Sequence, residues 1–146
     1  MAPGKGPSYP PVVGLRCVIV DDNAGFIRAA SLLLEQEGLQ VVGSAGSEAE
    51  AVRQVAELRP DVTLVDIDLG AESGFDVVRR LVGDPDLEPG EVILISAHAE
   101  EDLADLIEAS PATGFLGKPA LSAAGIQRLV EGAGGAATGS PAPVTG

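Results

Sequence analysis

Residues 60–78 read PDVTLVDIDLGAESGFDVV, and their pattern is the clearest indication of the fold class. A short apolar run ends on Asp66, a polar turn containing glycine follows, and the apolar residues then recur at helical spacing. A strand without polar alternation is typical of a parallel sheet that is covered on both faces. The stretch therefore predicts one strand–helix unit of an α/β fold.

Four other runs have the same character, and each is followed by a segment with helical periodicity. We therefore expect a doubly wound five-stranded parallel sheet with helices on both faces and right-handed crossovers. The ligand site of such a sheet lies at the carboxyl ends of its strands. The predicted strands are 15–20, 39–44, 62–66, 91–96 and 114–117, and the predicted helices lie around 26–34, 49–56, 75–81, 101–109 and 122–131.

Composition narrows the class of protein further. The 146 residues suffice for one ordinary domain. A formal net charge of −13 argues against nucleic acid and anionic membrane surfaces as partners, because phosphate binding needs clustered Lys and Arg. No run approaches the roughly 18 apolar residues of a membrane span, and the N-terminus lacks the apolar core of a signal peptide, so we expect a cytoplasmic protein.

Both ends of the chain are rich in Gly, Pro and Ala. Residues 1–13 are predicted to be a flexible N-terminal tail, and residues 132–146, GAGGAATGSPAPVTG, a disordered C-terminal tail without the side chains for a packed core. The expected domain covers 14–131 and stands alone. Cys17, the single cysteine, lies in an apolar run and is expected to be a buried structural thiol.

Polar side chains follow the predicted strands, where a parallel sheet would bring them together. Asp21 and Asp22 follow the first strand, Asp66 ends the third, Ser96 ends the fourth and Lys118 follows the fifth. Three carboxylates in one cleft repel each other unless a cation holds them, and oxygen ligands suit Mg²⁺. A lysine and a hydroxyl could hold the remaining oxygens of a phosphoryl group during transfer. The set is chemically complete for phosphoryl transfer to a carboxylate.

Each of these residues also has an ordinary structural interpretation. Asp22 and Asn23 could cap the first helix, and residues 66–68 could be a common acidic loop. Ser96 could be a strand-end hydroxyl and Lys118 a solvated surface charge. Their joint placement at four strand ends favours the functional interpretation.

Four segments closely resemble, in order, the signature segments of the receiver domain of bacterial response regulators. The resemblance covers about residues 14–131 and implies the flavodoxin-like (βα)5 receiver fold. The separations between the strand-end residues also fit this family. The segments are VIVDDN (18–23), PDVTLVDIDLGAESGFDVV (60–78), VILISA (92–97) and GFLGKP (114–119).

The resemblance implies a role for each strand-end residue. Asp66 would accept the phosphoryl group and also bind Mg²⁺, together with Asp21 and Asp22. Asp68 would contribute only its backbone carbonyl to the metal. Lys118 would pair with the phosphoryl group.

The resemblance also implies a conformational switch formed by Ser96 and Phe115. The Ser96 hydroxyl would move toward the phosphoryl oxygens, and Phe115 would rotate into the space left behind. Phe115 could instead be a half-buried strand residue. Phe26, on the first helix, is interpreted as packing, and Pro119 would follow a cis peptide bond.

Two features depart from the usual family pattern. The loop after Asp66 reads DLGAESG where a Met-Pro-Gly type is usual, so its turn geometry and partner surface could differ. Asp68 and His98 occupy the positions that commonly tune the lifetime of the phosphoryl group. A carboxylate and an imidazole could each orient or obstruct an attacking water. His98 could also be an ordinary exposed loop side chain.

The function implied by the resemblance is that of a stand-alone receiver in a phosphorelay. A histidine kinase or phosphotransfer protein would phosphorylate Asp66 in the presence of Mg²⁺. The surface of the fourth helix, fifth strand and fifth helix would then contact an unknown target protein. The chain would catalyse only its own phosphorylation and dephosphorylation, as a monomer or weak homodimer.

Two other functions are compatible with parts of the sequence. A receiver-like interaction module could work without phosphorylation, and the altered loop after Asp66 keeps this alternative open. A haloacid-dehalogenase-like phosphohydrolase would also place two aspartates after an apolar strand, as in residues 66–68. That family has its nucleophile near the start and its acidic metal pair last, whereas Asp21 and Asp22 come first here.

Overall fold

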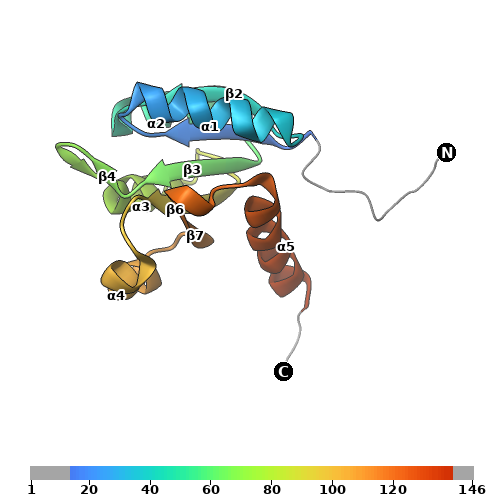
Figure 1. Cartoon of the computed structure of the whole chain (residues 1–146). Coiled ribbons are helices and arrows are strands. Elements are labelled where there is room, and N and C mark those ends of the chain that lie inside the picture. Colours follow the sequence, from blue (N-terminus) through green and yellow to red (C-terminus); the bar gives the residue numbers. More distant parts are fainter. Residues whose placement is uncertain (1–13, 140–146) are drawn as a thin grey trace.

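A five-stranded parallel sheet forms the centre of the molecule, with helices on both of its faces (Figure 1). The computed structural model describes residues 14–139. The strands of the sheet are β1 (Arg16–Val20), β2 (Gln40–Ala45), β3 (Val62–Asp66), β6 (Glu91–Ser96) and β7 (Gly114–Gly117), and a separate antiparallel hairpin consists of β4 (Asp68–Leu69) and β5 (Glu72–Ser73).

The strand order is β2-β1-β3-β6-β7, so the winding of the sheet reverses at β1. All neighbours in this sheet are parallel, and β1 pairs with both β2 and β3. A reversal of this kind opens a crevice beyond the carboxyl ends of the strands, because the loops on either side diverge toward opposite faces. The crevice lies beside the ends of β1 and β3.

Five α-helices cover the sheet, and side-chain caps fix where three of them begin. Asn23 accepts a hydrogen bond from the Phe26 N–H, Ser47 from the Glu50 N–H and Ser73 from the Phe75 N–H. Such caps satisfy backbone donors that a helix start leaves free. The helices are α1 (Ala24–Gln36), α2 (Glu48–Leu58), α3 (Gly74–Gly83), α4 (Ala104–Ala109) and α5 (Ala123–Gly139), with 3₁₀ turns at Glu100–Leu103 and Lys118–Ala120.

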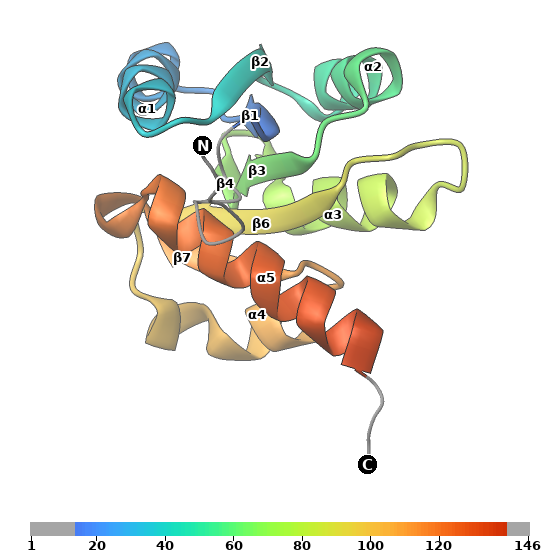
Figure 2. The same cartoon turned by 90° about the vertical axis from the view of Figure 1, so that its right-hand side faces the viewer.

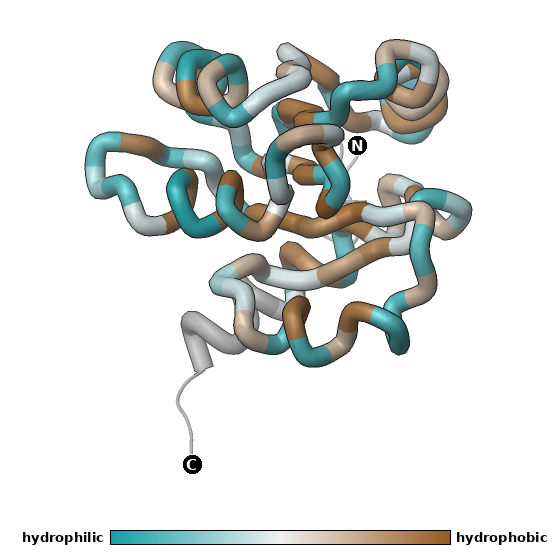
Figure 3. The backbone as a smooth tube through the Cα atoms, turned by 90° about the vertical axis from the view of Figure 1, so that its left-hand side faces the viewer, coloured by the Kyte–Doolittle hydropathy of each residue, from teal (hydrophilic) through white to brown (hydrophobic). Residues whose placement is uncertain are grey.

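The core has two layers, one on each face of the sheet. Cys17 and Ile19 of β1 pack in a cluster that includes residues of α1 and α5. Val18 and Val20 pack in a second cluster with residues of α2 and α3. Figure 2 shows α1 and α5 on one side of the strands and α2 and α3 on the other. In Figure 3 the hydrophobic residues gather on the strands between these layers.

The fold predicted from the sequence is confirmed, and the strands at 62–66, 91–96 and 114–117 have the predicted bounds. The predicted fourth helix begins instead with a 3₁₀ turn at Glu100–Leu103. Helix α5 continues to Gly139 and so enters the segment predicted to be a tail from residue 132. The predicted N-terminal tail, 1–13, and residues 140–146 lie outside the described part.

One backbone prediction is wrong. The peptide bonds of the described residues are all trans, including the bond before Pro119. Residues Lys118–Ala120 form a 3₁₀ turn, in which the Leu121 N–H donates to the Lys118 carbonyl at 3.2 Å. None of the described helices is both long enough and apolar enough to cross a membrane.

Candidate phosphoacceptor site

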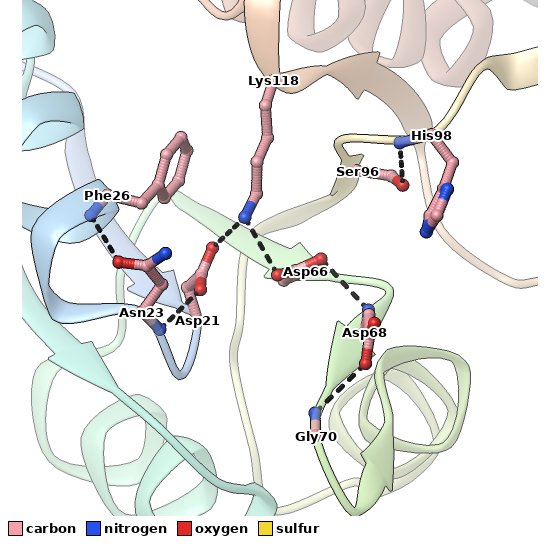
Figure 4. A network of polar contacts seen from close by, with 9 residues as sticks. All are labelled: Asp21, Asn23, Phe26, Asp66, Asp68, Gly70, Ser96, His98 and Lys118. Carbon is pink, nitrogen blue, oxygen red and sulfur yellow. Dashed lines mark hydrogen bonds and ion pairs between the residues drawn. The ribbon is translucent and has the colours of Figure 1, made fainter.

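A cleft of about 280 Å³ opens at the carboxyl edge of the sheet. It brings together residues that the sequence places at the ends of β1, β3 and β7, with contributions from the hairpin and from the loop after β6. Figure 4 shows Asp21, Asp66 and Lys118 converging from separate elements. The lining residues are Asp21, Asp22, Asn23, Asp66, Asp68, Gly70, Ala97, His98 and Lys118.

Three carboxylates dominate the cleft. Oxygen atoms of Asp21, Asp22 and Asp66 all lie within 4.8 Å of one another. Asp21 and Asp66 are buried, at 1% and 5% exposure, whereas Asp22 is exposed. Backbone geometry holds them there, because Asp21 directly follows β1 and Asp66 is the last residue of the neighbouring β3. The sheet therefore imposes the repulsion between these groups, and a cation would relieve it.

Lys118 supplies one positive charge between two of these carboxylates. Its Nζ lies 2.7 Å from Asp21 Oδ2 and 3.1 Å from Asp66 Oδ2. The same ammonium lies 4.2 Å from the centroid of the Phe26 ring, on α1. Aspartate and lysine side chains that are so little exposed interact more strongly than surface ion pairs. Lys118 is therefore fixed in the cleft and is not a solvated surface charge.

Burial and these contacts change two pKa values. Burial raises the pKa of Asp66 above its usual value, and the hydrogen bonds from the Asp68 N–H and from Lys118 offset this only in part. Burial lowers the pKa of Lys118, but its close contacts with the Asp21 and Asp66 carboxylates outweigh that effect and raise it. The lysine is thus charged at neutral pH. Burial destabilises the ionised form of Asp66, and a further positive charge in the cleft would stabilise it.

The loop after Asp66 folds into the β4–β5 hairpin and completes one side of the site. The Asp68 N–H donates to Asp66 Oδ1 at 3.0 Å. Gly70 has a φ of +71°, and a Cβ added there would lie 3.0 Å from Asp22 Oδ2. Asp68 is exposed and its carboxylate accepts a hydrogen bond from the Gly70 N–H at 3.2 Å. The altered loop therefore retains a backbone donor on the predicted acceptor.

Gly74 lets α3 begin directly against the acceptor strand. A Cβ at this position would lie 2.7 Å from the Ile67 Cα and even closer to the Asp66 carbonyl oxygen. The Gly74 N–H donates to the Ile67 carbonyl at 2.7 Å. Only glycine fits so close an approach of two backbones. The glycine is therefore part of the framework that positions Asp66.

The residues predicted to form the switch lie outside the cleft lining. Ser96 is buried at 1% exposure, and its hydroxyl accepts a hydrogen bond from the His98 N–H at 2.9 Å. Phe115 is half-buried and lines a neighbouring groove with Pro119 and Ala120. His98 is exposed and lines both the cleft and this groove. The loop after β6 thus contacts Ser96 and borders the groove that Phe115 lines.

Sequence reasoning missed part of the role of three residues at the site. Asn23 caps α1, as the ordinary interpretation allowed, and its N–H also donates to Asp21 Oδ1 at 2.8 Å. Phe26 packs against the core, as predicted, and its ring also faces the Lys118 ammonium. Gly74 followed a cap-like serine in the sequence, which could have indicated a tight helix start. The contact of Phe26 has no sequence signal, because it depends on how α1 lies over the sheet.

The donor set fits a hard divalent cation. Asp21 Oδ2 is buried and accepts no well-aligned hydrogen bond from the described residues, although the Lys118 ammonium is close. Three carboxylates face a single lysine in the cleft, which leaves an excess of negative charge. Carboxylate oxygens with room for water are the ligands that Mg²⁺ prefers. The cleft thus has the chemistry of a Mg²⁺ site.

Comparisons of this chain with a family model and with known proteins agree on one family. The model of the response regulator receiver domain matches residues 17–130. The response regulator GacA of Pseudomonas viridiflava is 30% identical over 122 residues, which cover 80% of this chain and 52% of that protein. A protein-glutamate methylesterase/protein-glutamine glutaminase of Haloarcula marismortui is 32% identical over 108 residues, which cover 73% of this chain and 28% of that protein. The chain thus spans about half or less of the length of these relatives.

Solved structures agree with this. The signal receiver domain of a modulated diguanylate cyclase from Desulfovibrio desulfuricans G20 superposes with a TM-score of 0.66 at 30% identity, covering 82% of this chain and 93% of that one. The family match, from 17 to 130, runs through every strand end that contributes to the cleft. The chain therefore belongs to the family of response regulator receiver domains of two-component signalling.

Proposed function

We propose that this chain is a phosphoacceptor switch that takes a phosphoryl group on Asp66 in the presence of Mg²⁺. One observation carries the proposal. Asp66 is almost fully buried, yet it lies in an open cleft between the Lys118 ammonium, at 3.1 Å, and the Asp68 N–H, at 3.0 Å. A carboxylate held by two donors beside further carboxylates is suited to receive a phosphoryl group and to stabilise its charge.

The chain's own residues account for most of the chemistry. One Asp66 carboxylate oxygen forms the new P–O bond, and the P–N bond of a phosphohistidine donor breaks, with the imidazole as the leaving group. Lys118 is placed to neutralise charge on the transferring oxygens, and the Asp68 N–H keeps the acceptor carboxylate oriented. Positioning and charge stabilisation are the main requirements of this transfer.

The metal would be held by Asp21, Asp22 and Asp66, with the backbone carbonyl of Asp68 as a further ligand. When bound, Mg²⁺ supplies charge neutralisation for both the carboxylates and the phosphoryl oxygens. Asn23 supports this set, because its N–H donates to Asp21 Oδ1 at 2.8 Å. The other Asp21 oxygen is the one that faces the cleft lysine.

The proposed output surface comprises α4, β7 and α5. Phosphorylation would draw the Ser96 hydroxyl toward the cleft and break its bond with the His98 N–H, which is 2.9 Å in this structure. Phe115, half-buried beside the same loop, would then turn inward and change the surface over β7. The donor would be a histidine kinase or a phosphotransfer protein, and the output a contact with another protein in the cytoplasm, by a monomer or weak homodimer.

The proposal limits catalysis to the chain's own phosphorylation and dephosphorylation. The methylesterase and glutaminase activities appear in the name of a relative of which this chain spans only 28%. The alternative of a receiver that works without phosphorylation would leave the cleft intact but unused. The two functions differ in one observable, a phosphoryl adduct on the protein.

A small phosphodonor tests the proposal without a cognate kinase. The protein is incubated with acetyl phosphate or phosphoramidate and Mg²⁺, and its intact mass is measured beside the Asp66→Asn variant. We expect one added phosphoryl group on the parent, none on the variant, and none on the parent after chelation of Mg²⁺. Equal labelling of the variant would assign the phosphoryl group elsewhere, and no labelling of either protein would favour the phosphorylation-independent module.

A further inference from the structure

The β4–β5 hairpin connects the phosphoacceptor site to α2, a helix that contributes no residue to the cleft. At one end of the hairpin, the Asp68 N–H donates to Asp66 Oδ1 at 3.0 Å. At the other end, Glu72 Oε1 accepts a hydrogen bond from the Glu48 N–H, the first of α2, at 2.8 Å. The hairpin is therefore held at both ends, by the acceptor and by a helix start.

One backbone N–H at the start of α2 needs an acceptor from outside the helix. The Ser47 side chain accepts from the Glu50 N–H, and the Glu50 carboxylate turns back to the Gly46 N–H at 2.7 Å. These contacts leave the Glu48 N–H to be satisfied by Glu72. A carboxylate at a helix start is stabilised by both the free N–H groups and the helix dipole. Glu72 is exposed, so solvent screens its charge, and the accepted hydrogen bond is the main part of this contact.

The hairpin has little support of its own. Its two strands pair only through Asp68 with Ser73 and Leu69 with Glu72. Leu69 is buried, at 4% exposure, whereas Gly70 and Ala71 at the tip are exposed. A two-stranded ribbon of this size is not stable alone in water. Its position consequently depends on the contacts at its ends and on the Leu69 side chain.

We propose that Glu72 is a positioning residue of the phosphoacceptor site, because its contact with α2 holds the hairpin where Asp68 meets Asp66. This inference rests on the proposed function, since it treats Asp68 as a part of the Mg²⁺ and phosphoryl site. Glu72 itself is exposed and does not line the cleft, and its side chain accepts a hydrogen bond from Glu48 and not from a residue of the cleft. It acts only through the two short strands of the hairpin.

The local charges indicate which variant should retain the contact. Glu72 lies along a groove of about 470 Å³ with Arg53 and Arg80. Arg80 approaches Glu48 at 3.6 Å and Asp84 at 3.7 Å, and among the described residues Glu72 forms no ion pair. The contact of Glu72 therefore requires an oxygen acceptor more than a negative charge. Glutamine keeps such an oxygen, whereas alanine removes it.

Hydrogen exchange in the metal-free protein tests the contact itself. We compare Glu72→Ala, Glu72→Gln and a control, Glu57→Ala, which removes the same charge from an exposed position of α2. In Glu72→Ala we expect exchange of the Glu48 amide to be about tenfold faster, and that of the Asp68 amide about threefold faster. The other two variants should exchange like the parent. Unchanged exchange of the Asp68 amide in Glu72→Ala would overturn the inference.

Mg²⁺ affinity, measured by calorimetry, tests the consequence for the site. Supporting residues outside a metal's ligand set commonly change affinity by about 10- to 100-fold, and because Glu72 acts through the hairpin we expect about a three- to tenfold larger Kd in Glu72→Ala. Glu72→Gln and Glu57→Ala should stay within about twofold of the parent. Equal weakening by Ala and Gln would reduce Glu72 to a charge effect and overturn the inference.

The two proposals fail in different ways. A parent protein that binds no Mg²⁺ and accepts no phosphoryl group would refute the proposed function. The exchange rates of the Glu48 and Asp68 amides would still decide whether Glu72 positions the hairpin. Normal Mg²⁺ binding by the parent and by Glu72→Ala alike would leave the function standing and refute the role of Glu72.

Discussion

Replacing Gly74 with alanine should destabilise the protein, although alanine favours helices. The new Cβ would lie 2.7 Å from the Ile67 Cα, where ordinary contact begins at 3.4 Å, and closer still to the Asp66 carbonyl oxygen. Both neighbours are backbone atoms, so no side chain can move aside. Overpacking of this kind costs about 1–3 kcal/mol, and we expect the upper part of that range. Better helix propensity returns only about 0.5–1 kcal/mol.

Gly83 provides a matched control at the other end of α3. A Cβ there has nothing within 4 Å, so Gly83→Ala should be neutral or stabilising by up to about 1 kcal/mol. Urea unfolding followed by far-UV circular dichroism suits this chain, which has no tryptophan. Gly74→Ala should lower the free energy of unfolding by about 1–3 kcal/mol relative to the parent. Equal stabilities of the two variants would refute the close approach of α3 to the acceptor strand.

Other perturbations address single contacts. Lys118→Ala leaves the buried Asp21 carboxylate without its cation, so with a chelator present we expect urea unfolding to show a free energy of unfolding lower by about 1–3 kcal/mol. Mg²⁺ should restore part of this stability, and a loss that Mg²⁺ cannot reduce would contradict the shared site. Asn23→Ala removes the cap of α1 and should cost about 1 kcal/mol by the same assay, and an unchanged midpoint would count against the cap. Burial raises the pKa of Cys17 from 9.0 to about 12, so the folded state should lose stability as pH rises above about 9. A thiol reagent at pH 8 should label only unfolded protein, and rapid labelling of native protein would be inconsistent with burial. Because burial raises the pKa of Asp66, protons should compete with Mg²⁺ at a higher pH than they would for an exposed aspartate. Calorimetry at falling pH should therefore show the Mg²⁺ affinity declining above pH 3.8, the ordinary pKa of an aspartate, and a constant affinity down to that pH would be the contrary result.

The sheet could be predicted from the sequence because its strands are buried on both faces. The strand 62–66 is buried at every position, and 91–96 at all but the first. Continuous apolar runs of this kind carry a strong signal. The strand ends then fix where Asp21, Asp66 and Lys118 meet, since parallel strands share one carboxyl edge. The cleft therefore follows from the order of the elements.

Other features depend on tertiary contacts that leave no local pattern. The hairpin after Asp66 has only two residue pairs. Its Glu72 side chain accepts a hydrogen bond from the Glu48 N–H of α2, a helix that precedes the hairpin in the chain. The contact of Phe26 with Lys118 depends on the packing of α1 against the sheet. In α5, the many glycines indicated a tail, but the helix continues to Gly139. Alanines between those glycines favour helix, and composition alone does not reveal which tendency prevails.

Identification of the phosphorylated residue would show whether Asp66 is the phosphoacceptor. After labelling with a small phosphodonor and Mg²⁺, borohydride reduction converts an aspartyl phosphate to homoserine, and tandem mass spectrometry of the peptides locates the converted residue. The structure predicts homoserine at position 66 alone, because Asp66 is the carboxylate held by both Lys118 and the Asp68 N–H. Homoserine at Asp21, Asp22 or Asp68, with position 66 unchanged, would contradict the assignment of the acceptor.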